Sequence, residues 1–211
     1  MPELPEVETT VLDLQKKVLN RTFVDLWTDF KKMIKKPDLE KFKKEIKGKK
    51  IQRVWRRGKN IIFDLSNGLS LLIHQKLTGH LLLGNWVLEK GEWKAKVPGP
   101  LSEDPMNRFL HLIFWLDDGR MLALSDLRKF AKVELLNQEE LKKELSSLGP
   151  EPLEKSFTFE KFKEVLPKKR ENKTGLNGPK YYCRNRQYLF RRNLMAGENS
   201  SLQRCFKIGR S

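Results

Sequence analysis

The residues best suited to chemistry lie at the start of the chain. If the initiator methionine is removed, which the small neighbour Pro2 permits, the chain begins with the secondary amine of a proline. An α-amino group is a weaker base than a lysine side chain, so a useful fraction is unprotonated at neutral pH and can attack an electrophilic carbon. Glu3 and Glu6 follow, and carboxyl groups beside an amine nucleophile can transfer protons for it. The simpler alternative is that Pro2 only starts a helix.

The elements that must position this amine are a helix and, after it, mainly strands. One helical face is expected close behind Pro2, formed by Val7, Val11, Leu14 and Val18. Alternating apolar residues flank the turns at residues 66–68 (SNG) and 117–119 (DDG), which predicts two β-hairpins. Residues 87–107 contain three prolines and are expected to form a loop. Short helices are expected at residues 138–148 and from residue 160 onward.

The composition favours a polyanionic partner. Lys and Arg number 43 against 27 Asp and Glu, a net charge of +16, so nucleic acid is the first candidate, an anionic membrane surface the second, and an inert basic surface the bland alternative. No apolar run approaches the roughly 20 residues of a membrane-spanning helix, and the acidic start is unlike a secretory signal. The two cysteines, Cys183 and Cys205, exclude a disulfide framework and a four-cysteine zinc site within this chain. We therefore expect a cytoplasmic protein without a metal cofactor.

Five segments make the prediction specific. They are residues 1–9 (MPELPEVET), 56–59 (RRGK), 74–79 (HQKLTG), 126–130 (DLRKF) and 148–153 (LGPEPL). In the same order, they closely resemble the opening, the DNA-contacting hairpin, the His-x-x-Met-(Thr/Ser)-Gly motif, the Asp-Pro-Arg-Arg-Phe motif and the interdomain linker of formamidopyrimidine-DNA glycosylase. That family performs base-excision repair of oxidised purines with an N-terminal proline nucleophile.

The resemblance implies a domain plan. Residues 1–136 are expected to form a mixed, mainly β catalytic domain, a two-sheet antiparallel β-sandwich with flanking helices. Residues 137–153 would be a linker, and residues 154–170 the start of a helical DNA-binding domain that is incomplete in this chain. The implied partner is damaged double-stranded DNA, bound by a monomer without a membrane.

The resemblance also implies catalytic roles. Pro2 would attack C1′ of the damaged nucleotide, expel the base and hold the sugar as a Schiff base. Glu3 would protonate the sugar and Glu6 would organise the site. Lys59 would bind a phosphate beside the lesion and assist the strand-cutting steps. The alternative for Lys59 is a solvated cation in a basic hairpin.

The remaining roles concern DNA binding. An enzyme that acts on a base extrudes it from the duplex, so something must fill the gap. The family uses a methionine, an arginine and a phenylalanine, and the matching residues are Leu77, Arg128 and Phe130. DNA contacts are also expected from His74 and Arg170. As alternatives, Leu77 and Phe130 would be core residues, His74 a satisfied histidine at a strand end, and Arg170 part of a solvated charge run.

The tail, residues 171–211, departs from the family. It lacks the Gly-Ile-Gly-Asn-Ile-Tyr-like motif of the second domain and the cysteines of a C-terminal zinc ribbon. Residues 181–190 (YYCRNRQYLF) can be encoded so that a reading frame one nucleotide later gives Ile-Ile-Ala-Gly-Ile-Gly-Asn-Ile-Tyr-Ser. Permitted codons for residues 192–201 likewise give Asp-Glu-Ile-Leu-Trp-Leu-Ala-Lys-Ile-His-Pro. We therefore expect a frameshifted tail and impaired activity; the alternative is a lineage-specific basic extension.

Two other functions compete with a purine-specific glycosylase. The first is a non-catalytic DNA-binding fragment that keeps the site residues without turnover. The second is an enzyme like endonuclease VIII, which prefers oxidised pyrimidines and whose opening is expected to read Pro-Glu-Gly-Pro. Leu4 argues against the second.

Overall fold

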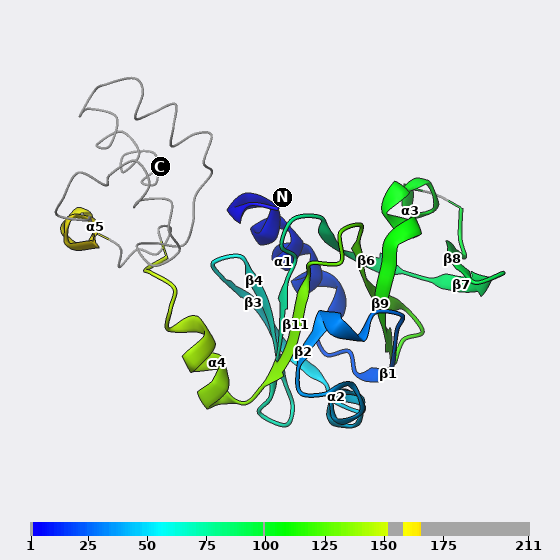
Figure 1. Cartoon of the computed structure of the whole chain (residues 1–211), viewed down its shortest axis with the longest axis horizontal. Coiled ribbons are helices and arrows are strands. Elements are labelled where there is room, and N and C mark those ends of the chain that lie inside the picture. Colours follow the sequence, from blue (N-terminus) through cyan, green and yellow to red (C-terminus); the bar gives the residue numbers. More distant parts are fainter. Residues whose placement is uncertain (1, 99, 152–157, 166–211) are drawn as a thin grey trace, which may run out of the picture. The chain divides into compact units, whose positions relative to one another are not determined.

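In a computed structural model of the chain, helices flank two β-sheets (Figure 1). The structure describes residues 2–98, 100–151 and 158–165. The chain divides between Lys142 and Lys143 into two units, and the first contains both sheets. Within the described residues, no helix is long and apolar enough to cross a bilayer.

The first sheet has four strands in the order β1–β9–β10–β6, and all neighbouring strands are antiparallel. Their bounds are β1 Phe23–Thr28, β6 Gly79–Gly84, β9 Leu110–Leu116 and β10 Met121–Asp126. Strands β9 and β10 form the hairpin predicted around the DDG turn, where Gly119 has a φ of +80°. That backbone conformation is one that glycine adopts without steric cost.

The second sheet has five strands in the order β2–β11–β5–β4–β3. Their bounds are β2 Ile34–Lys36, β3 Ile51–Arg57, β4 Asn60–Leu65, β5 Ser70–His74 and β11 Lys132–Leu136. Strands β4 and β5 form the hairpin predicted around the SNG turn. All pairs are antiparallel except β2 with β11, which is parallel. The mainly β, two-sheet prediction is confirmed, with this one parallel edge added.

Helix α1 (Leu4–Val18) supplies much of the domain core. Its buried face includes the four apolar positions that the helical spacing predicts, Val7, Val11, Leu14 and Val18. They pack with apolar side chains from both sheets and from helix α2 (Leu39–Ile46), which follows the 3₁₀ turn η1 (Lys31–Met33). The helix period of these apolar residues therefore fixes which side of α1 faces the sheets.

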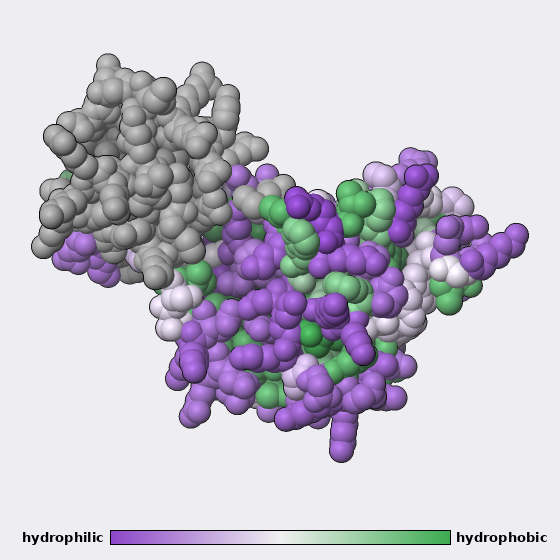
Figure 2. All heavy atoms as spheres, in the orientation of Figure 1, coloured by the Kyte–Doolittle hydropathy of each residue, from purple (hydrophilic) through white to green (hydrophobic). Residues whose placement is uncertain are grey.

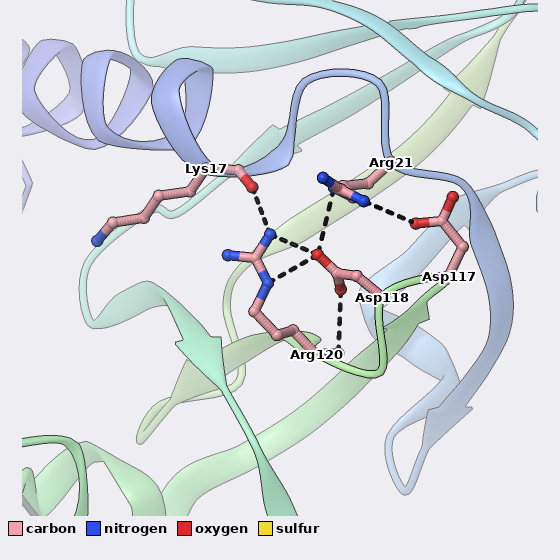
Figure 3. A network of polar contacts seen from close by, with 5 residues as sticks. All are labelled: Lys17, Arg21, Asp117, Asp118 and Arg120. Atoms are coloured by element: carbon pink, nitrogen blue, oxygen red, sulfur yellow. Dashed lines mark hydrogen bonds and ion pairs between the residues drawn. The ribbon is translucent and has the colours of Figure 1, made fainter.

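The C-terminal end of α1 is tied to the β9–β10 turn (Figure 3). Arg120 donates from Nη2 to the Lys17 carbonyl at 2.7 Å and from Nε to Asp118 at 2.8 Å, and Arg21 lies 3.2 Å from the same carboxylate. Burial raises the pKa of Asp118, but the hydrogen bonds and charge of Arg120, with the charge of Arg21, outweigh it and hold the pKa below its usual value. The network fixes one end of the helix against the first sheet.

Residues 87–107, expected to be a loop, contain regular structure. They hold most of a third, two-stranded sheet, β7 (Trp86–Glu89) with β8 (Glu92–Ala95), followed by α3 (Pro100–Glu103) and η2 (Pro105–Phe109). Both central residues of the β7–β8 turn, Lys90 and Gly91, have positive φ, the geometry that matches the twist of a hairpin. Trp86 is buried and donates to Asn107 at 2.7 Å. The prolines therefore lie between or at the ends of short regular elements and do not prevent them from forming.

Two helices follow the sheets along the chain. Helix α4 (Gln138–Leu145) occupies the start of the expected linker, and α5 (Phe159–Val165) lies where a second helix is expected. Arg170 and the tail at residues 171–211, with both cysteines, lie outside the described residues.

Candidate functional site

The N-terminal segment presents Pro2 immediately ahead of α1. Pro2 is partly buried, and Glu3 is the N-cap, with an extended backbone. The backbone N–H of Glu3 donates to Oε2 of Glu6 at 3.0 Å, so the first helical turn closes on its own cap. The Glu6 carboxylate thus orients residue 3 and, through it, Pro2. This placement brings together all three of the candidate residues at the N-terminus.

Lys59 lies in the tight turn between β3 and β4. Gly58 has a φ of +56°, a left-handed conformation that lets the chain reverse in two residues. Asn60 closes the turn by donating from Nδ2 to the Arg57 carbonyl at 3.3 Å. The hairpin packs against α1, where Gln15 donates to the Val54 carbonyl at 2.7 Å. The turn therefore holds Lys59 on the sheet that α1 covers.

His74 lies at the same end of the second sheet as Lys59. It pairs in register with Asn60 on one side and with Lys132 on the other. The Lys76 backbone N–H donates to Nδ1 of His74 at 3.0 Å, so the neutral ring carries its proton on Nε2. Burial, with the charges of Lys76, Lys132 and Lys59, lowers the pKa of His74 to about 4. His74 is therefore a neutral hydrogen-bond donor at neutral pH.

This lowered pKa makes the free energy of unfolding depend on pH. Between pH 6.5 and 4 the unfolded chain binds a proton at this histidine that the folded chain does not, so stability is fully present above pH 6.5 and is lost as the pH falls toward 4. We expect the contribution of His74 to this loss to be about 2–3 kcal/mol. Denaturant unfolding at pH 7 and pH 4 measures it, with His74→Asn as the reference, since the amide oxygen that this substitution introduces can still accept from Lys76. Parallel profiles for the two proteins would contradict the assignment.

Two loops lie side by side next to this sheet edge, residues 75–78 and 127–131, which we call the wedge loops. The pairing of Gly79 with Asp126 places them at neighbouring strand ends. The face of the domain drawn in Figure 2 is mainly hydrophilic. Phe130 is 51% exposed, and the Arg128 guanidinium lies 4.6 Å from its ring centroid. Leu77, at the first loop, is partly buried. The exposure of Phe130 makes it unlike a core residue.

The carboxylate of Asp126 joins the two wedge loops. Asp126 is fully buried and accepts the Thr78 hydroxyl and the Arg128 N–H (3.2 Å) on Oδ1, and the Ala131 N–H (2.7 Å) on Oδ2. Gly79 is required beside it, because an added Cβ would meet the Gln75 carbonyl oxygen at 2.4 Å. The loops are therefore held by a buried charged acceptor rather than by apolar packing alone.

Sequence reasoning assigned no role to three residues that shape this site. Asp126 is the first residue of the DLRKF segment, and its position at the end of a strand, just before Arg128 and Phe130, could have indicated a role in holding the loop. Lys132 forms an ion pair with Glu134 at 2.8 Å and pairs in register with His74, which only the strand register reveals. Arg56 contacts helix α1, a contact between residues far apart in sequence. In the described part of the chain, no cluster of three His, Cys, Asp or Glu side chains could hold a metal.

Comparison with known proteins identifies the family to which this arrangement is similar. Residues 1–133 match the family described as the formamidopyrimidine-DNA glycosylase N-terminal domain. A formamidopyrimidine-DNA glycosylase of Pelotomaculum thermopropionicum is 36% identical over 168 residues, covering 79% of this chain and 55% of the relative. One from Streptococcus thermophilus is 38% identical with the same coverage. The chain thus spans about half the length of the curated relatives it matches.

Solved structures agree in fold. The complex of wild-type Lactococcus lactis Fpg (MutM) with N7-benzyl-Fapy-dG-containing DNA has a TM-score of 0.63 at 28% identity, covering 78% of this chain and 55% of that protein. A structure of MutM with DNA containing carbocyclic 8-oxo-G also has a TM-score of 0.63, at 29% identity, covering 78% and 56%. Both of these solved structures are complexes with DNA.

Proposed function

The chain belongs to the formamidopyrimidine-DNA glycosylase family, and from this premise we propose that its first domain performs that family's chemistry on oxidised purines in DNA. The substrates are formamidopyrimidine and 8-oxoguanine lesions in double-stranded DNA. The protein acts as a monomer in the cytoplasm, with activity reduced because residues 171–211 lack the Gly-Ile-Gly-Asn-Ile-Tyr-like motif of the family's second domain. The observation that supports this best is the pair of adjacent wedge loops, one of which carries Leu77 and the other Arg128 and the half-exposed Phe130.

The proposed reaction begins at Pro2. Once Met1 is removed, the proline nitrogen attacks C1′ of the damaged nucleotide, a C1′–N bond to the protein forms and the bond to the base breaks. The departing base keeps the electron pair of that bond and takes up the proton that the proline nitrogen loses. Glu3 transfers a proton to the sugar as its ring opens, which leaves an iminium between Pro2 and C1′. Loss of a proton from C2′ then expels the 3′ phosphate oxygen and cuts the strand. Water finally releases the sugar and regenerates the amine.

The rest of the site binds and reshapes the DNA. Lys59 neutralises a phosphate next to the lesion, and His74 donates to the backbone from Nε2, at the sheet edge that both residues share. Leu77, Arg128 and Phe130 occupy the space that the extruded nucleotide leaves in the base stack. Arg170 is a further phosphate contact in this proposal, from outside the described residues.

Covalent trapping tests the proposed function. Duplex DNA with one abasic site is mixed with the protein and borohydride at low salt, where phosphate contacts bind most strongly. We expect a crosslink at the N-terminal residue, located by peptide mass. DNA binding without a crosslink would instead identify a non-catalytic DNA-binding fragment.

A second experiment compares the release of two damaged bases from duplex DNA. Greater release of thymine glycol than of 8-oxoguanine would identify a pyrimidine-specific enzyme like endonuclease VIII.

The tail belongs to the same proposal. We propose that residues 171–211 are a frameshifted reading of the family's second domain. The lengths of the alignments with the relatives support this proposal, because they are 168 to 175 residues in a chain of 211. Sequencing the gene after codon 170 is the test. The +1 frame is expected to encode the Gly-Ile-Gly-Asn-Ile-Tyr motif, and restoring it should strengthen DNA binding by orders of magnitude through added phosphate contacts. Absence of the motif in that frame would leave a lineage-specific extension.

A further inference from the structure

Arg56 connects the helix behind Pro2 to the turn that holds Lys59. From strand β3, its Nε donates to the Glu8 carboxylate on helix α1, and its Nη1 donates to the Gly58 carbonyl at 3.1 Å. The Arg56 side chain is only 9% exposed, whereas Glu8 is 41% exposed. We call these two contacts the Arg56 bridge. One guanidinium therefore contacts both elements that present the proposed reacting groups.

These two elements are far apart in the sequence, so that contacts between their side chains must fix their relative position. Pro2 is carried by α1 and Lys59 by the β3–β4 hairpin, and the amine and the phosphate-binding cation must be held at a fixed separation for attack on a bound nucleotide. A misplacement of about 1 Å can reduce an enzymatic rate by about 100-fold. We propose that Arg56, with Glu8 as its partner, is a positioning residue that sets the place of Lys59 relative to Pro2. This inference rests on the proposed function.

The shape of the bridge explains why arginine is required. The guanidinium is planar and can donate in two fixed directions, to the carboxylate on one side and to the turn carbonyl on the other. A lysine ammonium could meet Glu8 but would not hold both acceptors in one geometry. Because Gly58 directly precedes Lys59, displacement of its carbonyl rotates the peptide that carries Lys59.

The other end of α1 offers a matched control. There Arg120 makes the same pair of contacts, to a carboxylate (Asp118) and to a backbone carbonyl (Lys17), but it joins the helix to the first sheet. Removing either arginine breaks an ion pair and a hydrogen bond to a backbone carbonyl, and in each case one of the two contacts is to helix α1. Only the Arg56 bridge reaches the Lys59 turn, so the two losses should affect stability alike and catalysis differently.

The test measures single-turnover borohydride trapping, DNA dissociation constants and melting temperature for Arg56→Gln, Glu8→Gln and Arg56→Lys, with Arg120→Gln as the control. We expect Arg56→Gln to slow trapping by about 10- to 100-fold, with a dissociation constant within about threefold of wild type, because a loss confined to the reacting geometry lowers the rate and spares binding. Glu8→Gln, which leaves Arg56 in place, should show a smaller loss of the same kind. Arg56→Lys should recover the melting temperature but only part of the rate. Arg120→Gln should trap at the wild-type rate.

Each outcome decides the question. Trapping by Arg56→Gln at the wild-type rate would overturn the positioning role while the proposed function stands. Equal slowing by Arg120→Gln would show that the rate follows helix stability, which also overturns it. Failure of the wild-type protein to trap would overturn the proposed function. In that case the Arg56 bridge can still be tested by the backbone amide chemical shifts of Gly58 and Lys59. If these shifts are the same in Glu8→Gln as in wild type, Glu8 does not act on the turn through Arg56, and the positioning role is overturned as well.

Discussion

Replacing Pro2 with glycine should lower borohydride trapping of abasic DNA by roughly 100-fold or more. The secondary amine of proline gives a cationic iminium on losing water, and the pyrrolidine ring fixes the backbone angle that aims the nitrogen. Glycine keeps a terminal amine but loses the ring and adds backbone freedom. The Glu3–Glu6 cap (3.0 Å) remains in the variant, so folding should be nearly unchanged.

The measurement needs two controls. The melting temperature of Pro2→Gly should stay within a few degrees of wild type, which separates lost chemistry from lost structure. A protein that retains Met1, identified by intact mass, should trap far less, because its Pro2 nitrogen is an amide and its terminal amine lies one residue further from the site. Full trapping by either protein would sink the assignment of Pro2 as the nucleophile.

Replacing Asp126 with asparagine should destabilise the domain by about 2–4 kcal/mol, measured by denaturant unfolding. Oδ1 accepts from Thr78 and Arg128, and Oδ2 accepts from Ala131. If the NH₂ group of the variant takes the place of Oδ2, the Ala131 N–H loses its acceptor. If it takes the place of Oδ1, it cannot accept from the Thr78 hydroxyl or from the Arg128 N–H, which keeps only its 3.1 Å hydrogen bond to the Thr78 hydroxyl oxygen. Since the site is fully buried, water cannot replace the lost bond without opening the wedge loops.

The same variant should also lower the trapping of an abasic site in duplex DNA. Trapping of an abasic site in a single strand should fall less than trapping in a duplex, because only the duplex requires the wedge loops to fill a gap. Asp118→Asn is the matched control. Its partners Arg120 and Arg21 lie on the partly exposed β9–β10 network, where an ion pair is worth at most about 1 kcal/mol. Equal losses in both variants would contradict the special role of the buried acceptor.

The layout of residues 1–136 could be predicted from the sequence, because local signals and the fold agree there. The valine and leucine spacing of α1 matches its buried face, and the turns at residues 66–68 and 117–119 lie where hairpins form. The prediction of a loop at residues 87–107 was wrong for a physical reason. Their prolines stand between short elements, and the Lys90–Gly91 turn that organises β7 and β8 is a weaker signal than a run of prolines.

The candidate site divides in the same way. Motif order was enough to nominate Leu77, Arg128 and Phe130, and the structure puts the segments that contain them on adjacent loops. What sequence could not provide are contacts set by packing between distant segments. The Arg56–Glu8 pair spans 48 positions and the Thr78–Asp126 bond also spans 48. No local periodicity encodes such distances. The pKa of His74 is lowered by burial and by three lysines, of which Lys76 is a neighbour in the sequence, whereas Lys132 and Lys59 come near His74 only in the folded sheet.

The two tethers of helix α1 have a consequence for the order of events during biosynthesis. The amine-bearing segment leaves the ribosome first, but the residues that fix it come later, Arg56 after 48 positions and Arg120 103 positions after Lys17. At typical elongation rates the second delay is about 5 to 20 s. During that interval the N-terminus is still accessible to a methionine aminopeptidase acting on the nascent chain. In the proposed function, Met1 can therefore be removed before helix α1 docks, so that the Pro2 amine is exposed before the domain has formed.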